Sequence, residues 1–586
     1  MKNILVNVFK ALLLIMALVF LELNKNTLTG WLLTFLIVFL YIYLYKTTEI
    51  NRVLLLFGSV LLFVITVYVS WPPYKFVPAV ANKDPEPSEV VTTVYGKVKG
   101  VLNEDRSVAV YAGIPYAKEP VGELRFKEPR DPDSYLGTLI ADHFMYRSMQ
   151  KENIPFYDSL ARIIGYHDYK ISLDDNYREP ISEDCLYLNI FKPNKDIRGL
   201  PVLVFVHGGS LQNGESSSFE YNGENLAKED IIFVSLTYRM GAFGFLADRQ
   251  LMEESKNHST GNYGLLDVLQ ALKWIKGNIA YFGGDPNNVT LAGESAGAAL
   301  VSALCTSPLA EDLFEKAVLE SSTLASKVPP HSYRQLDEAL ASGEELKERY
   351  GVLDINELRA LPAEDLVKEA DSQHHITVDG YVLKEDPYES YLKNIHNEKA
   401  ILHGFNSEES GPFVLFSQAN MKNYEDKLRY FFGDLTDEVL ALYPANSDKE
   451  AKENWAMIYG ALFFNYPHYC LNRLAAADLI PVYEYRFSKQ NGSLGPWHSG
   501  EMIYLYGNIP ESSSVYDDSD RKLSHTMSKY LINFVKNGDP NGSDLPEWKE
   551  NLDSKTLMQF DEETKMIDDD LICLYAIMDK VYGFGF

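Results

Sequence analysis

The chain is poor in cysteine and in basic residues, and each shortage excludes a class of protein. Among its 586 residues the only cysteines are Cys185, Cys305, Cys470 and Cys573. They lack the paired spacing of zinc sites, and four in so long a chain do not form a disulfide framework. Lys and Arg number 54 against 82 Asp and Glu, a formal net charge of −28. This balance argues against nucleic-acid binding, which needs clustered basic side chains for phosphate contacts.

The scarcity of acidic residues at the start of the chain marks a separate module. Residues 1–75 contain six basic and two acidic side chains, which leaves a net charge of −32 for the remainder. Three apolar stretches, 4–23, 28–45 and 53–71, each reach the length of about 17–20 residues that a helix needs to cross a bilayer. We therefore predict a membrane module of three transmembrane helices in residues 1–75 that contacts the lipid bilayer. A cleaved signal peptide is the alternative for the first stretch, although no small-residue cleavage site follows it.

The basic residues that flank these stretches give a weak orientation signal. One side of the predicted module holds Lys2, Lys46 and Arg52, with Lys10 nearby, and the other holds Lys25, Lys75 and Lys83. The positive-inside rule then predicts a cytoplasmic N-terminus and a C-terminal domain outside the cytoplasm, at the cell membrane. Residues 76–89 are rich in proline and lack apolar periodicity, so we predict a semi-extended linker and a globular domain over 90–586.

Apolar runs in the globular part alternate with helical periodicity. Strands are expected at 92–98, 107–111, 186–191, 202–207, 231–236, 289–291, 316–320, 399–403 and 482–487. Helices are expected at 262–279 and 296–306. Strands that alternate with helices indicate an α/β fold with a mostly parallel sheet.

One motif in this pattern carries recognisable chemistry. Residues 289–298 read VTLAGESAGA, which is an apolar strand, a G-x-S-x-G turn and a helix of small residues. A serine at such a tight turn takes strained backbone dihedrals, and the flanking glycines avoid side-chain clashes. Its hydroxyl is then exposed at the carboxyl edge of the sheet, beside a helix N-terminus that stabilises negative charge. This placement favours Ser295 as a nucleophile.

A second loop upstream fits the same chemistry. Residues 204–210 read VFVHGGS, a buried strand that ends in adjacent glycines. Such a loop can present bare backbone N–H groups to a substrate carbonyl, although an ordinary glycine turn after a strand has the same pattern.

Together with further segments, these motifs resemble the type B carboxylesterase family, the cholinesterase-like branch of the α/β-hydrolase fold. The matching segments are SEDCLYLNI at 182–190, YRMGAFGFL at 238–246, GNYGLLD at 261–267, FGGDP at 282–286 and NFVKNGDPN at 533–541. They span nearly 500 residues in the right order. The resemblance implies an α/β-hydrolase fold and a serine carboxylic-ester hydrolase that needs no cofactor or metal and acts on small-molecule esters. It does not cover the first 75 residues.

The resemblance also implies the site residues. The triad order Ser, acid, His assigns Ser295 as nucleophile, Glu409 in the segment ILHGFNSEES and His498 in the segment LGPWHSGE. A slip of one residue would choose Glu408 instead of Glu409. By similarity, the backbone N–H groups of Gly209, Ser210 and Ala296 form the oxyanion hole, with Ser210 where the family usually has a third glycine.

The chain departs from the family in ways that bear on substrate and function. Ser148 stands where secreted members have the disulfide partner of Cys185, so Cys185 is expected to be unpaired. The loop from 150 to 181 lacks the tryptophan that holds quaternary ammonium in cholinesterases, so choline esters are not expected as preferred substrates. Some family members have lost the serine. A catalytically silent binding or adhesion domain on a membrane anchor is therefore the alternative function, and a transport or sensing unit in the membrane module is a third.

Overall fold

The computed structural model describes the chain with several gaps and divides it into two compact units. The described residues are 2–152, 178–327, 333–368, 375–414, 417, 419–490, 495–511, 513, 515–551 and 554–584. The first unit comprises Met1–Phe76, Glu152–Pro180 and Ser513–Val515, and the second comprises Val77–Lys151, Ile181–Ser512 and Tyr516–Phe586.

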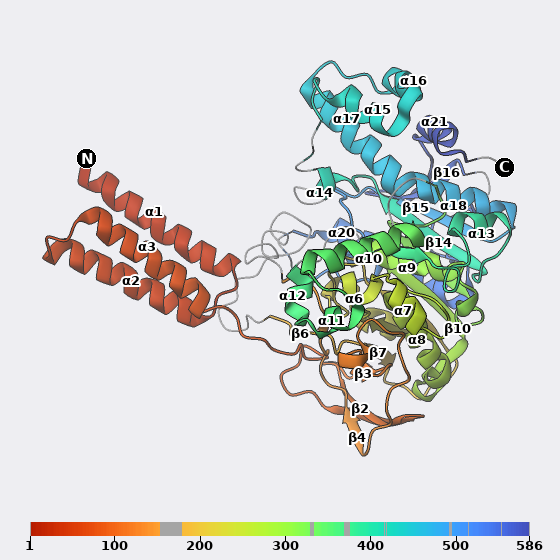
Figure 1. Cartoon of the computed structure of the whole chain (residues 1–586), viewed down its shortest axis with the longest axis horizontal. Helices are drawn as coiled ribbons and strands as arrows, with labels where there is room; N and C mark the ends of the chain where they lie inside the picture. Colours follow the sequence, from red (N-terminus) through yellow and green to blue (C-terminus); the bar gives the residue numbers. More distant parts are fainter. Residues whose placement is uncertain are drawn as a thin grey trace. The chain divides into compact units, whose positions relative to one another are not determined.

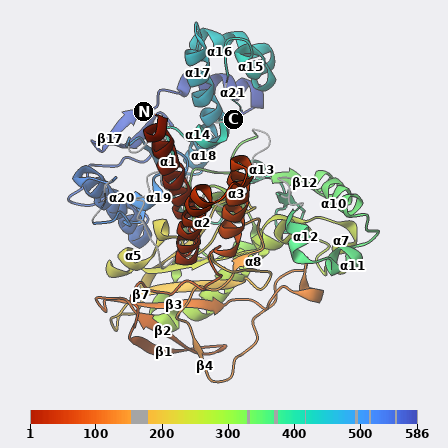
Figure 2. The same ribbon diagram turned by 90° about the vertical axis from the view of Figure 1, so that its left-hand side faces the viewer.

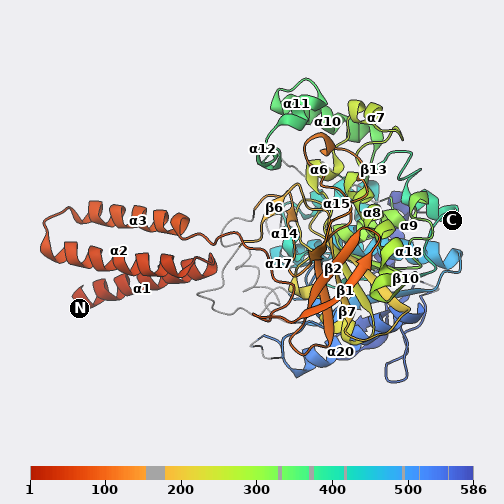
Figure 3. The ribbon, with the colours of Figure 1, turned by 90° about the horizontal axis from the view of Figure 1, so that it is seen from below.

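Three helices that lie side by side form most of the first unit (Figures 1 and 3). They are α1 (Lys2–Leu23), α2 (Leu28–Thr47) and α3 (Arg52–Val69), close to the three predicted stretches. By length and apolarity α2 and α3 could each cross a membrane, and the part of α1 whose side chains are described, Ala11–Leu23, is an apolar helical stretch. Phe39, Leu54 and Phe57 are 65–69% exposed. Side chains of this kind on the outside of a helix are typical of a surface that faces lipid rather than water.

A buried polar cluster joins these helices at one end, and no pattern in the sequence predicts it. The Asn26 side chain, in the turn between α1 and α2, donates hydrogen bonds of 2.8 Å to Val67 O and Ser70 Oγ at the end of α3. Thr27 N–H donates to Ser70 O at 3.0 Å. A side chain at Gly30 would lie 2.4 Å from Ser70 Oγ. The turn after α1 is thus bonded to the end of α3, so the first helix belongs to the same bundle.

The second unit begins earlier than predicted. Phe144 N–H donates to Val77 O at 2.8 Å and Ala79 N–H donates to Asp142 O at 2.9 Å, and Ala79 is buried. The first strand, β1, covers Pro87–Thr93. The predicted linker of 76–89 and domain start at 90 are therefore wrong from Val77 onward. Proline misled the prediction because it is tolerated at edge strands and at strand starts as well as in linkers.

A large twisted sheet organises the second unit. Its strands lie in the order β1-β2-β3-β7-β9-β8-β10-β11-β14-β15-β16-β17, with β4 (Thr138–Ile140) paired to β2. Neighbouring strands from β9 to β16 run parallel, and the pairs at the two ends of the sheet run antiparallel. The strands not yet given bounds are β2 (Gly96–Leu102), β3 (Val108–Pro115), β7 (Tyr187–Pro193), β8 (Leu200–Val206), β9 (Ile232–Leu236), β10 (Gly284–Glu294), β11 (Lys316–Glu320), β14 (Ala400–Asn406), β15 (Val482–Phe487), β16 (Thr556–Phe560) and β17 (Lys565–Asp568).

The predicted strand at 92–98 is wrong as a single element. It straddles a hairpin, in which Thr93 pairs with Gly96 across a turn at residues 94–95. The alternating pattern continued through the turn because Val94 and Tyr95 resemble strand residues and carry no glycine or proline signal. The other predicted strands and both predicted helices are present, with ends shifted by a few residues.

The central strands are buried along their whole length because helices cover the sheet. β9, β11 and β14 are buried at every residue, which is typical of parallel strands covered on both faces. Helices α8 (Tyr263–Asn278), α9 (Ala296–Cys305) and α20 (Asp518–Asn537) contact β10, and α9 also contacts β8 and β11. Other helices form two groups beside the sheet (Figure 2). One group holds α7 (Arg249–Glu254), α10 (Leu336–Tyr350), α11 (Ile355–Ala360) and α12 (Ala363–Lys368), and the other holds α15 (Tyr424–Phe432), α16 (Thr436–Leu442) and α17 (Asp448–Gly460).

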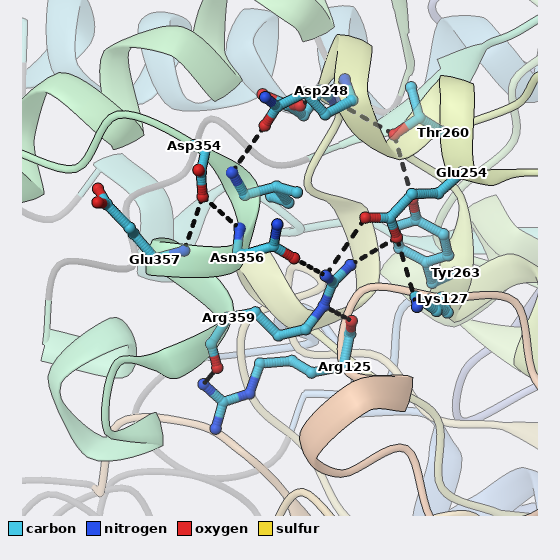
Figure 4. A network of polar contacts seen from close by, with 12 residues as sticks. Arg125, Lys127, Asp248, Glu254, Thr260, Tyr263, Asp354, Asn356, Glu357 and Arg359 are labelled. Atoms are coloured by element: carbon cyan, nitrogen blue, oxygen red, sulfur yellow. Dashed lines mark hydrogen bonds and ion pairs between the residues drawn. The ribbon is translucent and has the colours of Figure 1, made fainter.

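Two arginines fasten the first of these groups to the body of the unit (Figure 4). Arg359 in α11 donates to Arg125 O at 3.0 Å, and Arg125 donates back to Arg359 O at 2.8 Å. Arg359 also pairs with Glu254 of α7 at 2.8 Å, and Asp354 caps α11 through the N–H groups of Asn356 and Glu357. Because both arginines are buried and donate several hydrogen bonds, they hold α11 in a fixed position.

Candidate active site

Ser295 lies at the junction of β10 and α9 in a strained conformation. Its φ of 54° and ψ of −124° are unusual for a residue other than glycine. A side chain at Gly293 would come within 2.5 Å of Gly297 C, and one at Gly297 within 2.0 Å of Val206 O. The two flanking glycines are therefore required by close backbone packing, as the G-x-S-x-G pattern predicts.

The structure brings Ser295 together with the two other predicted triad residues. His498 Nε2 lies 2.9 Å from Ser295 Oγ, and His498 Nδ1 lies 2.6 Å from Glu409 Oε2. Glu409 follows the carboxyl end of β14, and His498 lies in the segment before the short helix α19 (Met502–Leu505). A hydroxyl, an imidazole and a carboxylate in this order can activate a nucleophile, transfer its proton and stabilise the resulting charge.

Hydrogen bonds distinguish Glu409 from its neighbour Glu408. Glu409 is buried, and its Oε1 accepts from Asn406 N at 2.7 Å and from Ser321 Oγ at 2.6 Å. Glu408 is exposed and accepts from the Gln490 side chain at 3.0 Å. Of these two residues, it is Glu409 that contacts the imidazole, so the alternative that a one-residue slip would give does not fit the geometry.

Three more buried carboxyl groups lie near Ser295, His498 and Glu409, and the sequence analysis assigned them no role. Glu294 Oε1 lies 3.4 Å from His498 Nε2 and accepts from Ser499 Oγ at 2.5 Å. Glu501 Oε2 accepts from the Asn406 side chain at 2.5 Å, and Glu320 Oε1 accepts from Tyr506 OH at 2.6 Å. Burial raises the pKa of Glu294 and of Glu320, and it raises the pKa of Glu501 to about 8. Glu294 and Glu501 are next to or within the quoted motifs, which was the available signal.

The surroundings of His498 set its protonation. Burial alone would lower the pKa of its imidazole, but the negative charges of Glu409 and Glu294 outweigh burial and raise the pKa to about 9. Two aromatic rings contact the imidazole, with centroid distances of 5.1 Å for Phe413 and 5.0 Å for Phe464. Phe464 lies in a π-helical turn, Ala461–Asn465, between α17 and α18 (Tyr466–Ala477). Such turns frequently occur at functional sites.

The predicted oxyanion donors lie in two places beside Ser295. Ala296 is the first residue of α9. Gly209 and Ser210 follow β8 in a loop in which both have positive φ, 102° and 56°. A side chain at Gly209 would lie 1.9 Å from Asn213 O, so only glycine fits there. Among the described residues, no backbone partner accepts from the N–H groups of Gly209 and Ser210. Ser210 is exposed.

Two other histidines, Cys185 and the possible metal ligands lie apart from the triad or were noted for other reasons. His468 is fully buried in α18, with its Nδ1 2.8 Å from His403 Nδ1, and His525 lies in α20; neither contacts the triad. Cys185 is a buried free thiol, as expected from Ser148 in place of a cysteine. Within the described parts of the chain, no group of three or more His, Cys, Asp or Glu side chains could hold a metal ion. Most of the loop whose lack of tryptophan was noted, residues 153–177, lies outside the described residues.

Comparison with known proteins gives the family. The profile of the carboxylesterase family matches residues 87–572. The chain belongs to the carboxylesterase family. Fumonisin B1 esterase of Sphingopyxis macrogoltabida is 34% identical over 496 residues, which cover 80% of this chain and 86% of that protein. Para-nitrobenzyl esterase of Bacillus subtilis (strain 168) is 30% identical over 512 residues, which cover 81% of this chain and 97% of that protein.

Solved structures agree with this assignment. A carboxylesterase of Geobacillus stearothermophilus has a TM-score of 0.71 and 31% identity, and the match covers 83% of this carboxylesterase and 99% of that chain. A PNB esterase has a TM-score of 0.69 and 29% identity, and the match covers 84% of this chain and 99% of that chain. The fold is thus an α/β-hydrolase fold, and the protein is a carboxylic ester hydrolase.

Proposed function

We propose that this carboxylesterase is a membrane-anchored serine hydrolase that uses Ser295, His498 and Glu409 as its catalytic triad. The observation that carries the proposal is the hydrogen-bonded row from Ser295 Oγ through His498 to Glu409, with distances of 2.9 and 2.6 Å. An intact row of this kind favours an enzyme over a catalytically silent binding domain.

The reaction follows from these contacts. His498 Nε2 takes the proton of Ser295 Oγ while that oxygen attacks the ester carbonyl carbon. The tetrahedral intermediate places its negative oxygen near the N–H groups of Gly209, Ser210 and Ala296. When it collapses, His498 gives the proton to the leaving alcohol, and an acyl-enzyme remains. Water, deprotonated by the same imidazole, then attacks the acyl carbon and releases the acid.

Glu409 keeps the imidazole in the orientation and tautomer that this cycle needs. Its Oε2 accepts from Nδ1, which leaves Nε2 free to accept the serine proton. Ser321 and Asn406 hold the other oxygen of Glu409, so the carboxylate cannot rotate away without breaking these hydrogen bonds.

Labelling by a serine-directed fluorophosphonate tests the enzyme proposal. The full chain should be labelled and should hydrolyse p-nitrophenyl acetate, and Ser295→Ala should abolish both while leaving the melting temperature within a few degrees. Folded wild-type protein that shows neither labelling nor Ser295-dependent hydrolysis would favour the silent binding domain.

Membrane anchoring is supported by the apolar helices of the first unit. We propose that α1, α2 and α3 each span the bilayer, because the Asn26 and Ser70 bonds join the end of α1 to the end of α3. Three spans place the N-terminus and the hydrolase domain on opposite sides of the membrane, with the domain outside the cytoplasm if the positive-inside rule holds. The full chain should stay in the membrane pellet at alkaline pH. External protease should cleave the domain from intact cells, and protection of the domain would reverse the orientation.

A further inference from the structure

The loop that carries two of the proposed oxyanion donors is strained over three consecutive residues. Gly209, Ser210 and Leu211 have φ values of 102°, 56° and 58°. Positive φ is unfavourable for a residue with a Cβ atom, such as Ser210 or Leu211, and this conformation persists only where the surroundings enforce it. The position of the Gly209 and Ser210 N–H groups therefore depends on whatever holds this loop, residues 207–214.

Hydrogen bonds within the loop, together with one to Gly241 outside it, fix the middle residues of the loop. Gly209 O accepts from Gln212 N at 2.9 Å and from Asn213 N at 3.0 Å, and Leu211 O accepts from Gly241 N at 2.6 Å. These contacts define the turn, but they do not fasten its last residue, Gly214, to the rest of the domain.

Within the part of the chain that the structure describes, one side chain, that of Gln150, fastens Gly214. The Gln150 amide donates from Nε2 to Gly214 O at 2.8 Å, and Gly214 N–H donates to Gln150 Oε1 at 3.1 Å. This pair of bonds to one residue resembles a rung of an antiparallel ladder. Gln150 is itself buried, and its Nε2 also donates to Ser148 O at 3.1 Å. It is therefore held by its own segment of the chain while it holds the loop.

Gly214 in turn packs against the start of the loop. A side chain there would lie 2.2 Å from His207 Nδ1 and 2.7 Å from Gly208 O. The next residue after Gly208 is the donor Gly209. The segment that contains Gln150 also supports His207, because Ser148 Oγ donates to Tyr238 O and Tyr238 OH donates to His207 O at 2.9 Å. A shift of Gly214 would therefore be passed to the Gly209 N–H through close contacts.

We propose that Gln150 is a positioning residue of the oxyanion hole: its amide clamps Gly214 and so aims the N–H groups of Gly209 and Ser210 at the developing oxyanion. This inference rests on the proposed serine-esterase function. It assigns a role in the reaction to a residue that touches neither the triad nor the substrate.

A pair of substrates that differ in one atom gives the test. Full-length wild type, Gln150→Met and Gln150→Glu are compared on p-nitrophenyl acetate and on its thiono analogue, in which sulfur replaces the carbonyl oxygen. Sulfur is a poor hydrogen-bond acceptor, so the ratio of kcat/KM for the two esters reports on the oxyanion hole. Rates are divided by the concentration of sites titrated with fluorophosphonate, which removes the effect of any unfolded fraction.

The expected result is a smaller ratio in the variants. One oxyanion donor contributes a factor of about 10²–10³ in kcat. Displaced N–H groups of Gly209 and Ser210 in Gln150→Met should therefore lower the ratio of kcat/KM for the oxygen ester to that for the thiono ester about tenfold or more, mainly through kcat on the oxygen ester. Gln150→Glu keeps the acceptor for Gly214 N–H but places a carboxylate oxygen against Gly214 O and Ser148 O, so its ratio should also fall.

Gln212→Met is the matched control. Gln212 lies on the same loop, and its buried amide nitrogen donates to no described residue. This variant should keep the wild-type ratio. An unchanged ratio in Gln150→Met, or an equal fall in Gln212→Met, would overturn the inference while leaving the esterase proposal intact. Absence of Ser295-dependent turnover in the wild type would instead reject the proposed function itself.

Discussion

Replacing Glu294 by glutamine changes the charge beside the proposed catalytic base with little change in shape. Glu294 is buried, and its Oε1 lies 3.4 Å from His498 Nε2. The glutamine oxygen can still accept the hydrogen bond from Ser499 Oγ. The substitution therefore tests whether this carboxylate helps to set the pKa of His498.

The direction and upper limit of the effect follow from the distance. A negative charge favours the imidazolium, so its loss lowers the pKa of His498, which the two nearby carboxylates raise to about 9. Coulomb's law at 3.4 Å with an effective dielectric constant of about 20 gives roughly 5 kcal/mol, or at most about 3.5 pH units. The real change will be smaller, because burial raises the pKa of Glu294 and so disfavours its charged form. We expect a fall of at least about 1 pH unit.

The pH dependence of kcat/KM measures this pKa in the free enzyme. Only the neutral imidazole accepts the serine proton, so activity should rise with pH through the pKa of His498. In Glu294→Gln this limb should move to lower pH. Glu408→Gln is the control, because it removes an exposed carboxylate next to Glu409 and should leave the limb in place. A limb that stays within 0.3 pH units in Glu294→Gln, or moves upward, would refute the argument.

Three further predictions concern the triad, the elbow and the core. Glu409→Gln should lower kcat by about 10³–10⁴ in active-site-normalised assays, because the imidazolium of His498 loses its partner; a fall below tenfold would contradict the assignment. Gly297→Ala should lower the melting temperature and abolish fluorophosphonate labelling, since its Cβ would lie 2.0 Å from a backbone oxygen. Gly277→Ala is the control, because Gly277 has open space around it in α8, and it should stabilise the folded protein by about 0.5–1 kcal/mol. Burial lowers the pKa of His403 to about 4. Between about pH 6.5 and 4 the unfolded state therefore binds more protons than the folded state. The free energy of unfolding should fall by about 3 kcal/mol as the pH drops through this window. Denaturant titrations of His403→Gln should show a shallower fall, and an identical pH dependence would exclude this residue as the cause.

The parts of the site that sequence could predict are those fixed by local backbone geometry. The elbow at Ser295 needs glycines two residues before and after it, and this spacing can be read directly. Glu409 and His498 follow from their segments' resemblance to the family, and the hydrogen bonds then separate Glu409 from Glu408.

The parts that sequence could not predict depend on contacts between distant segments. Gln150 acts through a residue 64 positions away, and Ser321 through one 88 positions away. No periodicity or spacing relates such pairs. The hairpin was missed for a different reason, because the two central residues of its turn, Val94 and Tyr95, are typical of strands. The buried stretch after Val77 was missed because its prolines resemble those of a linker.

The buried carboxyl groups create a problem of charge that the hydrogen bonds of the site help to resolve. If all four were ionised, their field would keep His498 protonated, and the imidazole could not accept the serine proton. Glu409 accepts a backbone N–H and a hydroxyl at Oε1 while its Oε2 faces His498. Glu501 also accepts from Asn406, but burial raises its pKa to about 8. Glu320 has a single donor from Tyr506, and its Oε2 meets no partner among the described residues, an environment that favours the neutral acid. The negative charge is thereby directed to the one carboxylate bonded to Nδ1, where it stabilises the imidazolium as Ser295 loses its proton.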